Sequence, residues 1–190
     1  MFEMKDINFL KTKDSIYLKK IKSKTDIGKD DCDGYLIESS EKGARKIIAS
    51  LKDKKTKKKI GFVGGDDAFN RRAVESLKID YLVSVEANVG KDSLKQRDSG
   101  LNHVVAKIAK EKGVKIVVDV GGISKLKGKE KAERIARVIQ NVKVCRRAGC
   151  SLKIGSFGLG KSDVVDEIGR KSFGVSLGMS SSEVRDCVEF

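Results

Sequence analysis

Two polar segments hold the side chains of this chain that could do chemistry. Segment 64–72 reads GGDDAFNRR and segment 95–103 reads KQRDSGLNH. Each follows an apolar run typical of a strand and opens a run with helical periodicity, where α/β folds place their binding and catalytic groups. Arg can grip a phosphate with two parallel hydrogen bonds, and its charge is insensitive to pH. The two segments therefore favour contacts with nucleic-acid phosphates.

The candidate RNA-contacting residues share a polar or basic side chain and an expected place at a strand end or on the polar side of a helix. They are Asn70, Arg71, Arg72, Arg97, Asp98, Asn102, His103, Lys107, Arg134, Arg137, Arg146, Arg147, Lys153 and Ser156. We expect no catalytic residue among them and no metal ligand.

Some of these residues have an equally ordinary structural role. Arg71 or Arg72 could pair with Asp66, Asp67 or Glu75 and so fix the loop, because ion pairs of this kind are common at protein surfaces. Both interpretations remain open from the sequence.

The same choice applies further along the chain. Asp98 is expected to order a turn or cap the helix that begins near residue 100, which would leave Arg97 to face RNA. A single histidine such as His103 is usually structural, and it has no partners for acid–base catalysis, so we favour a hydrogen bond to RNA or to the rim of the fold. Glu130 and Glu133 could neutralise part of the basic face of the segment 129–147.

Composition narrows the class of protein. The chain has 190 residues, with 39% hydrophobic and 36% charged, which suits a globular protein with a polar surface. Lys and Arg number 41 against 27 Asp and Glu, giving a net charge of +14 that attracts polyanions. A Lys-rich proteome or a salty cytoplasm would also account for this charge. Aromatic residues make up only 5% and Trp is absent, so recognition of RNA shape and phosphates is favoured over base stacking.

Membrane and metal-binding classes are not expected. No apolar run approaches the roughly 20 residues of a membrane span, and the N-terminus lacks the apolar core of a signal peptide, so we expect a cytoplasmic protein without membrane contact. Cys32, Cys145, Cys150 and Cys187 show no CxxC spacing, and the chain has one His. Reduced thiols are therefore expected rather than a zinc site.

Alternating strand-like and helix-like runs must position these side chains. Strands are predicted at 7–10, 16–21, 34–37, 60–63, 81–85, 116–120 and 152–154, and helices at 43–51, 70–77, 100–112 and 129–147. This alternation indicates one α/β domain over 1–190, with a parallel sheet covered by helices. Segments 52–59 and 121–131 are expected to be basic loops. Segment 162–170 has a helical pattern, 173–177 fits strand or helix, and Ser180 with Glu183 has the spacing of a capping box.

Three ordered motifs carry a resemblance to a known family. GGD-x₃-NRRAVE at 64–75, DYLVSVE at 80–86 and RDSGLNHVVAKIAKEKGVKIVVDV at 97–120 together resemble ribonuclease P protein component 3, and the likeness runs over roughly residues 55–185 to the closing SLGMSSSEV. The family pattern is altered at Gly155-Ser156, which stand in reversed order, and at Asp6-Ile7-Asn8, where the family often has Asp-Leu-His.

The resemblance implies a fold and a function. The fold is a TIM-barrel-like one akin to polymerase and histidinol phosphatase (PHP) domains, expected to be short or incomplete at the N-terminal edge. The function is that of a subunit of the ribonucleoprotein that removes 5′ leaders from precursor tRNA. In that family the RNA subunit performs the chemistry, and this protein pairs with component 2. The protein itself is then expected to hold no cofactor, and Mg²⁺ is expected for the RNA-catalysed reaction.

Two alternatives belong to other functional classes. A PHP-like metal-dependent phosphoesterase would use carboxylates such as Asp66, Asp67, Glu86 and Asp119. Such enzymes need several His and carboxylate ligands, and the single His disfavours this alternative. A generic basic scaffold would bind RNA without preferring ribonuclease P RNA.

Overall fold

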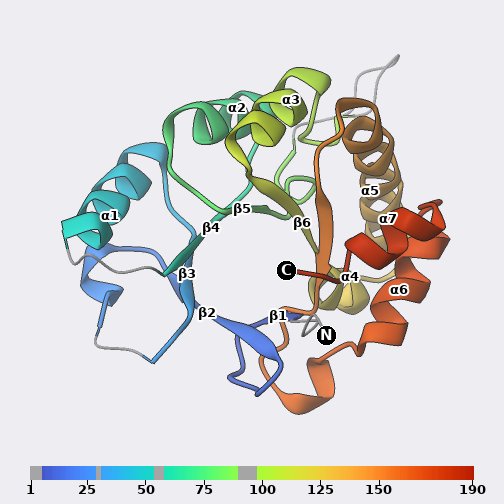
Figure 1. Ribbon diagram of the computed structural model, residues 1–190, viewed down its shortest axis with the longest axis horizontal. Helices are drawn as coiled ribbons and strands as arrows, with labels where there is room; N and C mark the ends of the chain where they lie inside the picture. The colour runs from blue at the N-terminus through green and yellow to red at the C-terminus, as the bar shows by residue number, and fades with distance from the viewer. Residues whose placement is uncertain (1–5, 29–30, 54–57, 90–97) are drawn as a thin grey trace.

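The strands form one parallel sheet that curls into a nearly closed barrel (Figure 1). The computed structural model describes residues 6–28, 31–53, 58–89 and 98–190. Its seven strands lie side by side in chain order. They are β1 (Asp6–Asn8), β2 (Ser15–Ile21), β3 (Gly34–Ile37), β4 (Lys59–Val63), β5 (Tyr81–Val83), β6 (Lys115–Asp119) and β7 (Leu152–Gly155). Each overlaps one of the predicted apolar runs, because β-branched residues and a hydrophobic run suit a strand that is buried on both faces.

The segment that follows β7 meets β1 and brings the ring close to closure. Phe157 N donates to Ile7 O at 2.8 Å, and Phe9 N donates to Gly158 O at 3.2 Å. The expected shortening at the N-terminal edge is visible, because β1 has three residues. Among the described residues the 3₁₀ turn η1 (Lys24–Asp26) is the only helical element between β1 and β3. The TIM-barrel-like fold inferred from the family resemblance is confirmed in this seven-stranded form.

Helices cover the outside of the ring, mostly beside β3 to β7 (Figure 1). They are α1 (Glu41–Asp53), α2 (Asp67–Ser76), α3 (His103–Lys112), α4 (Val120–Lys125), α5 (Gly128–Ala148), α6 (Glu167–Ser176) and α7 (Ser181–Asp186), with a 3₁₀ turn η2 (Lys161–Asp163). None of the helices in the described part of the chain is long and apolar enough to cross a membrane.

The core has two layers. The larger one lies between the sheet and the helices and includes the fully buried Phe62, Val105 and Ile116. The smaller one fills the inside of the barrel with residues such as Leu18 and Val117. Alternate residues of each strand point to opposite faces, so the strands supply both layers.

Two segments differ from the sequence prediction. Segment 121–131 is not a loop, because α4 and the start of α5 occupy it. The side chain of Asp119 accepts a hydrogen bond from Gly122 N at 2.6 Å and caps α4, while Ile123 packs into the core. The helix predicted at 162–170 begins only at Glu167, after Asp166 has capped it by accepting from Gly169 N at 2.7 Å.

The structure agrees more closely with the predictions for the C-terminal segment. Within segment 173–177, residues 173–176 belong to α6 and Leu177 is its C-cap, and Ser180 with Glu183 forms the expected capping box at the start of α7. The predicted basic loop at 52–59 is only partly described: α1 continues to Asp53, residues 54–57 lie outside the described residues, and β4 begins at Lys59.

Candidate nucleic-acid interface

Asn70 holds together the two loops that the sequence singled out. Its side chain is fully buried. Its Oδ1 accepts from Gly65 N at 2.8 Å, and its Nδ2 donates to Gly65 O at 2.9 Å and to Gly100 O at 2.8 Å. Gly100 has φ of +71°, and a Cβ there would lie 2.0 Å from Val85 O, so only glycine fits. The structure therefore gives Asn70 the role of fixing the loop ends after β4 and before α3, and not a place on the surface.

Arg71 and Arg72 are exposed on α2 and each has a carboxylate partner. Arg71 Nε lies 2.8 Å from Glu75 Oε1, one of the pairings left open by the sequence. Arg72 Nε lies 2.9 Å from Glu41 Oε2, a partner on α1 that the sequence did not indicate. Surface ion pairs of this kind are weak, so the two guanidinium groups are tethered but not removed from solvent.

The segment before α3 is organised by Asp98 and Asn102. Asp98 Oδ1 accepts from Gly100 N at 2.9 Å and orders the turn, which was one of the two expected roles. Asn102 caps α3 instead, because its Oδ1 accepts from Val105 N at 2.9 Å, and its Nδ2 donates to Asp67 Oδ2 at 2.6 Å. His103 is exposed as the first residue of α3. Arg97 lies outside the described residues.

The basic residues of α5 do not share one surface. Arg134 is half-buried and its Nη2 lies 3.4 Å from Ala87 O, with Arg137 half-buried one turn further on. Arg146 is twelve residues after Arg134, or about 18 Å along the helix. There it binds Glu183 with two hydrogen bonds of 2.8 and 2.6 Å. Arg147 is exposed beside it. The single basic rim expected from the sequence is therefore divided between the two ends of α5.

Lys153 and Ser156 are not on the surface. Lys153 has 3% of its surface exposed, and its Nζ binds Asp186 O at 2.6 Å and Asp186 Oδ1 at 2.8 Å. Ser156 is fully buried, and its hydroxyl donates to Val165 O at 2.8 Å. In β7 the apolar neighbours of Lys153 face the helices, so the alternation of the strand turns Lys153 to the other face. Both residues hold the C-terminal part of the chain to β7.

Two carboxyl groups lie near the carboxyl ends of neighbouring strands, with Glu86 buried and Asp119 partly buried. Burial raises the pKa of Glu86, after β5, to about 7, although Arg134 opposes the shift. Burial likewise raises the pKa of Asp119, at the end of β6, to about 6, against the hydrogen bond from Gly122 N. Neither oxygen of Glu86 has a hydrogen-bond partner among the described residues.

These carboxyl groups do not assemble into a metal centre. Asp66 caps α2, accepting from Phe69 N at 2.7 Å, and Asp67 accepts from Asn102. Within the part of the chain that the structure describes, no group of three or more His, Cys, Asp or Glu residues is arranged to hold a metal ion. All four cysteines are buried free thiols.

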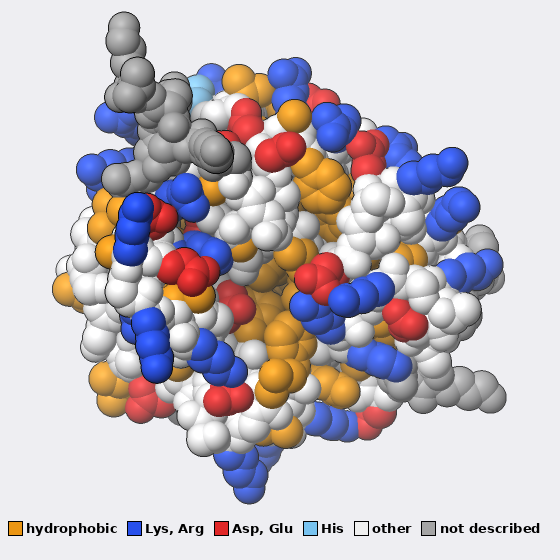
Figure 2. All heavy atoms as spheres, turned by 180° about the vertical axis from the view of Figure 1, so that it is seen from behind, with side chains coloured by type: hydrophobic (Ala, Val, Ile, Leu, Met, Phe, Trp, Pro, Cys, Tyr) orange, Lys and Arg blue, Asp and Glu red, His pale blue; other side chains and the backbone are white. Residues whose placement is uncertain are grey.

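A hollow of about 400 Å³ lies over the ends of β3 and β4. Val63 and Phe69 supply its apolar wall, and Glu38, Asp66 and Asn88 its polar one. On the face of the molecule shown in Figure 2, hydrophobic side chains lie at the centre, with acidic and basic side chains around them. The carboxylates of Glu38 and Asp66 would repel a phosphate, so the hollow over β3 and β4 is a poor phosphate site.

One group of exposed cations without an ion pair to the described residues lies on the outer sides of α3 and α5. Lys107 is exposed there as predicted, and it is accompanied by Lys110 and Lys143, which were not among the candidate residues. The signal for Lys143 was present in the sequence as an i, i+4 spacing from Arg147 on the polar side of the helix.

The chain is similar in sequence to two curated proteins. Both are called ribonuclease P protein component 3, come from strains of Methanococcus maripaludis and match 129 residues at 26% identity. The match covers 67% of this chain and 51% of each relative, so the chain spans about half the length of the curated relatives it matches. No family model matches the chain.

The fold is similar to that of several solved structures. One is a chain in a cryo-EM structure of archaeal ribonuclease P with mature tRNA, with a TM-score of 0.63, 20% identity, and coverage of 81% of this chain and 64% of that chain. Another is the crystal structure of an amidohydrolase, with a TM-score of 0.55, 15% identity, and coverage of 81% of this chain and 40% of that one. At these identities the likenesses show the fold alone. The curated relatives confirm the resemblance inferred from the motifs: this chain is similar to ribonuclease P protein component 3.

Proposed function

We propose that this chain is a protein subunit of a ribonuclease P ribonucleoprotein. It binds the catalytic RNA and supports the endonucleolytic removal of the 5′ leader from precursor tRNA. The observation that carries this proposal is the sequence similarity to ribonuclease P protein component 3 over 67% of the chain. The net charge of +14 and the likeness in fold to a chain of archaeal ribonuclease P with mature tRNA are consistent with it.

In this proposal the protein positions RNA and does not break bonds. The RNA subunit performs the hydrolysis with Mg²⁺, and the protein contributes phosphate contacts that lower the repulsion within a compact RNA. Ribonuclease P protein component 2 and other subunits of the complex are the proposed protein partners, and the cytoplasm is the proposed compartment.

Reconstitution tests the proposal directly. Cognate ribonuclease P RNA and the other protein subunits are assembled with and without this chain, and cleavage of precursor tRNA is followed over a range of Mg²⁺ concentrations. We expect omission to slow cleavage most at low Mg²⁺, where protein cations have most to contribute to charge neutralisation. Unchanged cleavage at every Mg²⁺ concentration would contradict the proposal.

The phosphoesterase alternative rests on Glu86, whose buried oxygens have no partner among the described residues. It predicts stoichiometric Mn or Zn in the purified protein and hydrolysis of a phosphoester by the protein alone. Metal analysis and a phosphoesterase assay without RNA distinguish it from the proposed function. A generic scaffold would bind random duplex RNA as tightly as ribonuclease P RNA.

A further inference from the structure

The outer sides of α3 and α5 form an unpaired basic surface. Lys107 and Lys110 lie on α3, Lys143 and Arg147 lie on α5, and all four side chains are exposed. The two helices pack against each other (Figure 1). None of the four side chains makes an ion pair or hydrogen bond with any residue that the structure describes. We call these four residues the α3–α5 surface.

Many other exposed cations have a carboxylate within reach. Arg71 pairs with Glu75, Arg72 with Glu41, and Arg146 with Glu183. The described residues supply no such carboxylate to the α3–α5 surface, and Lys143 and Arg147 repel each other at i, i+4 spacing. A bound polyanion would relieve this repulsion and release counterions.

The spacing of the four cations suits consecutive negative groups along a chain. Lys107 and Lys110 fall on one stripe of α3, which His103 extends by one turn. Lys143 and Arg147 are one turn apart, or about 6 Å along the axis of α5, and packed helices lie about 8–10 Å apart. Figure 2 shows basic side chains near the single histidine at the edge of the molecule.

Helix stability alone does not account for this arrangement. A cation in the last turn of a helix interacts favourably with the helix dipole, which would explain Lys110 and Arg147. Lys107 and Lys143 lie before the last turn, where this effect has fallen off. Glu111 is the only acidic residue of α3, so the surface keeps a positive balance.

We propose that the α3–α5 surface binds the phosphate backbone of folded RNA. This inference rests on the proposed function and specifies which part of the chain contacts the RNA. Neither α3 nor α5 contains Phe, Tyr or Trp, so these helices offer no large aromatic platform on which successive bases could stack. The surface reads backbone shape and charge, and its contribution is independent of base sequence.

The test compares two variants that lose the same charge. In the first, Lys107, Lys110, Lys143 and Arg147 are all changed to Gln. In the matched control, Lys13, Lys24, Lys42 and Lys46 are changed to Gln; these are also exposed, and the structure as described shows no ion pair for them. Both variants and the unchanged chain are assembled with the other protein subunits, and binding to ribonuclease P RNA is titrated at several salt concentrations.

The binding constant falls as salt concentration rises, and each lost phosphate contact makes the slope of log K against log salt shallower by about 0.7–0.9. We expect the first variant to have a slope shallower by about 3 and to bind at least about tenfold more weakly at low salt. The control should change the slope by less than about one. Circular dichroism shows whether each variant is folded. If the quadruple variant is unfolded, two double variants replace it: Lys107→Gln with Lys110→Gln, and Lys143→Gln with Arg147→Gln. Each double variant should show about half of the change in slope expected for the quadruple variant.

The outcomes separate the two proposals. If the unchanged chain neither binds ribonuclease P RNA nor accelerates cleavage, the proposed function is wrong. If the unchanged chain does both, and the two quadruple variants bind with the same salt dependence, the assignment to the α3–α5 surface is wrong and the proposed function stands.

Discussion

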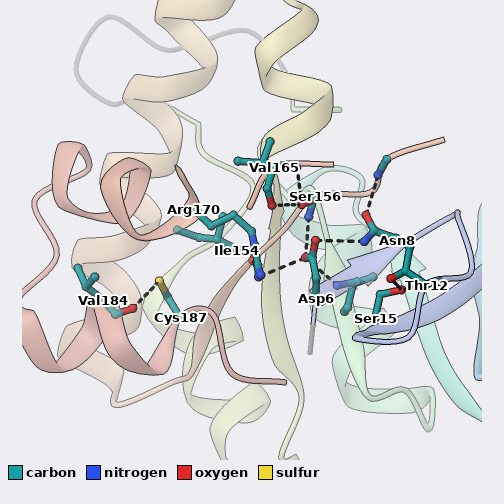
Figure 3. Close-up of polar contacts among 12 residues, drawn as sticks. Asp6, Asn8, Thr12, Ser15, Ile154, Ser156, Val165, Arg170, Val184 and Cys187 are labelled. Carbon is teal, nitrogen blue, oxygen red and sulfur yellow. Dashed lines mark hydrogen bonds and ion pairs between the residues drawn. The ribbon is translucent and has the colours of Figure 1, made fainter. Parts of the chain in front are cut away.

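Arg170 reaches from α6 into the barrel seam, where its Nη1 lies 3.2 Å from Asp6 Oδ1 of β1 (Figure 3). Both side chains are buried. The same carboxylate oxygen accepts from Ile7 N at 2.8 Å and from Ser156 N at 3.0 Å, and Arg170 Nη1 also donates to Ile154 O at 3.2 Å. The pair thus joins the first strand, the last strand and the helix that follows it.

Removing one member of this pair should destabilise the protein strongly. Arg170→Met leaves the Asp6 carboxylate buried without its counter-charge, and such changes cost about 3–5 kcal/mol. The free energy of unfolding, measured by urea denaturation, reports the loss. The control is Lys171→Met, which breaks a partly exposed pair with Glu167 on the same helix and should cost less than about 1 kcal/mol.

A double variant tests whether the loss comes from the unpaired buried charge. Asp6→Asn combined with Arg170→Met removes both charges, so no buried charge is left unpaired, and stability should recover part of the loss. Equal losses for Arg170→Met and Lys171→Met would show that the buried pair does not close the barrel.

The strands could be predicted from the sequence because their signal is local. A short β-branched run such as Ile116, Val117 and Val118 is apolar on both faces, as a parallel strand inside helices must be. The capping box of Ser180 and Glu183 is equally local. The barrel itself was inferred from the family resemblance.

The pairing of surface charges could not be predicted in the same way. Arg72 meets Glu41 and Arg146 meets Glu183 across separations of more than thirty residues, and such contacts appear only when the helices are packed. Lys153 illustrates a second difficulty. A charged residue in a strand suggests a binding surface. Lys153 is instead buried, and its partner Asp186 comes from the C-terminal end of the chain.

Asn70 should matter for stability and not for RNA contact. Asn70→Ala removes three hydrogen bonds from backbone groups of Gly65 and Gly100, and buried groups left unsatisfied cost about 1–3 kcal/mol. Urea unfolding should show a loss of about 2–3 kcal/mol in all. The neighbouring Arg71→Ala should cost less than about 0.5 kcal/mol, since its side chain is exposed. RNA affinity per folded molecule should be unchanged by Asn70→Ala, and a specific loss of affinity would contradict its placement as a structural residue.

The pair of Arg146 and Glu183 should give a modest stabilisation that disappears in acid. The hydrogen bond from Arg146 lowers the pKa of Glu183 to about 2. Because the folded-state pKa is depressed, the stabilisation is present above the ordinary Glu pKa of 4.5 and is lost as pH falls towards 2. Glu183→Gln keeps the capping box, so it isolates the charge and should cost at most about 1 kcal/mol at pH 7, since the pair is partly exposed.

The measurement for Glu183 is the free energy of unfolding from pH 7 down to pH 2. The difference between Glu183→Gln and the unchanged chain should shrink through this range. In the background of Arg146→Gln, Glu183→Gln should have little further effect. A difference that stays constant down to pH 2 would mean that the charge of Glu183 does not contribute.

Glu86 should shift stability in the opposite direction. Its pKa is raised from 4.5 to about 7 because it is buried. The folded protein therefore holds a proton that the unfolded chain has released, and stability is fully present below pH 4.5 and lost as pH rises through about 7. The rise of the Glu86 pKa from 4.5 to about 7 corresponds to about 3 kcal/mol. Asp119, with a pKa of about 6, adds a change of the same sign at lower pH.

Glu86→Gln removes the titration of this site while keeping its size. Gln stays neutral, so the variant should gain stability relative to the unchanged chain as pH rises from 4.5 to 8, by about 3 kcal/mol in all. Urea unfolding at four or five pH values in this range measures the gain. Glu111→Gln is the control, since Glu111 is exposed on α3 and its replacement should give no comparable pH-dependent difference. If Glu86→Gln and the unchanged chain differ by the same amount at every pH, the carboxyl group of Glu86 has the same pKa in the folded protein as in the unfolded chain and is ionised over most of this range. A cation or an internal water would then have to compensate it, because a bare carboxylate at that depth would not remain charged.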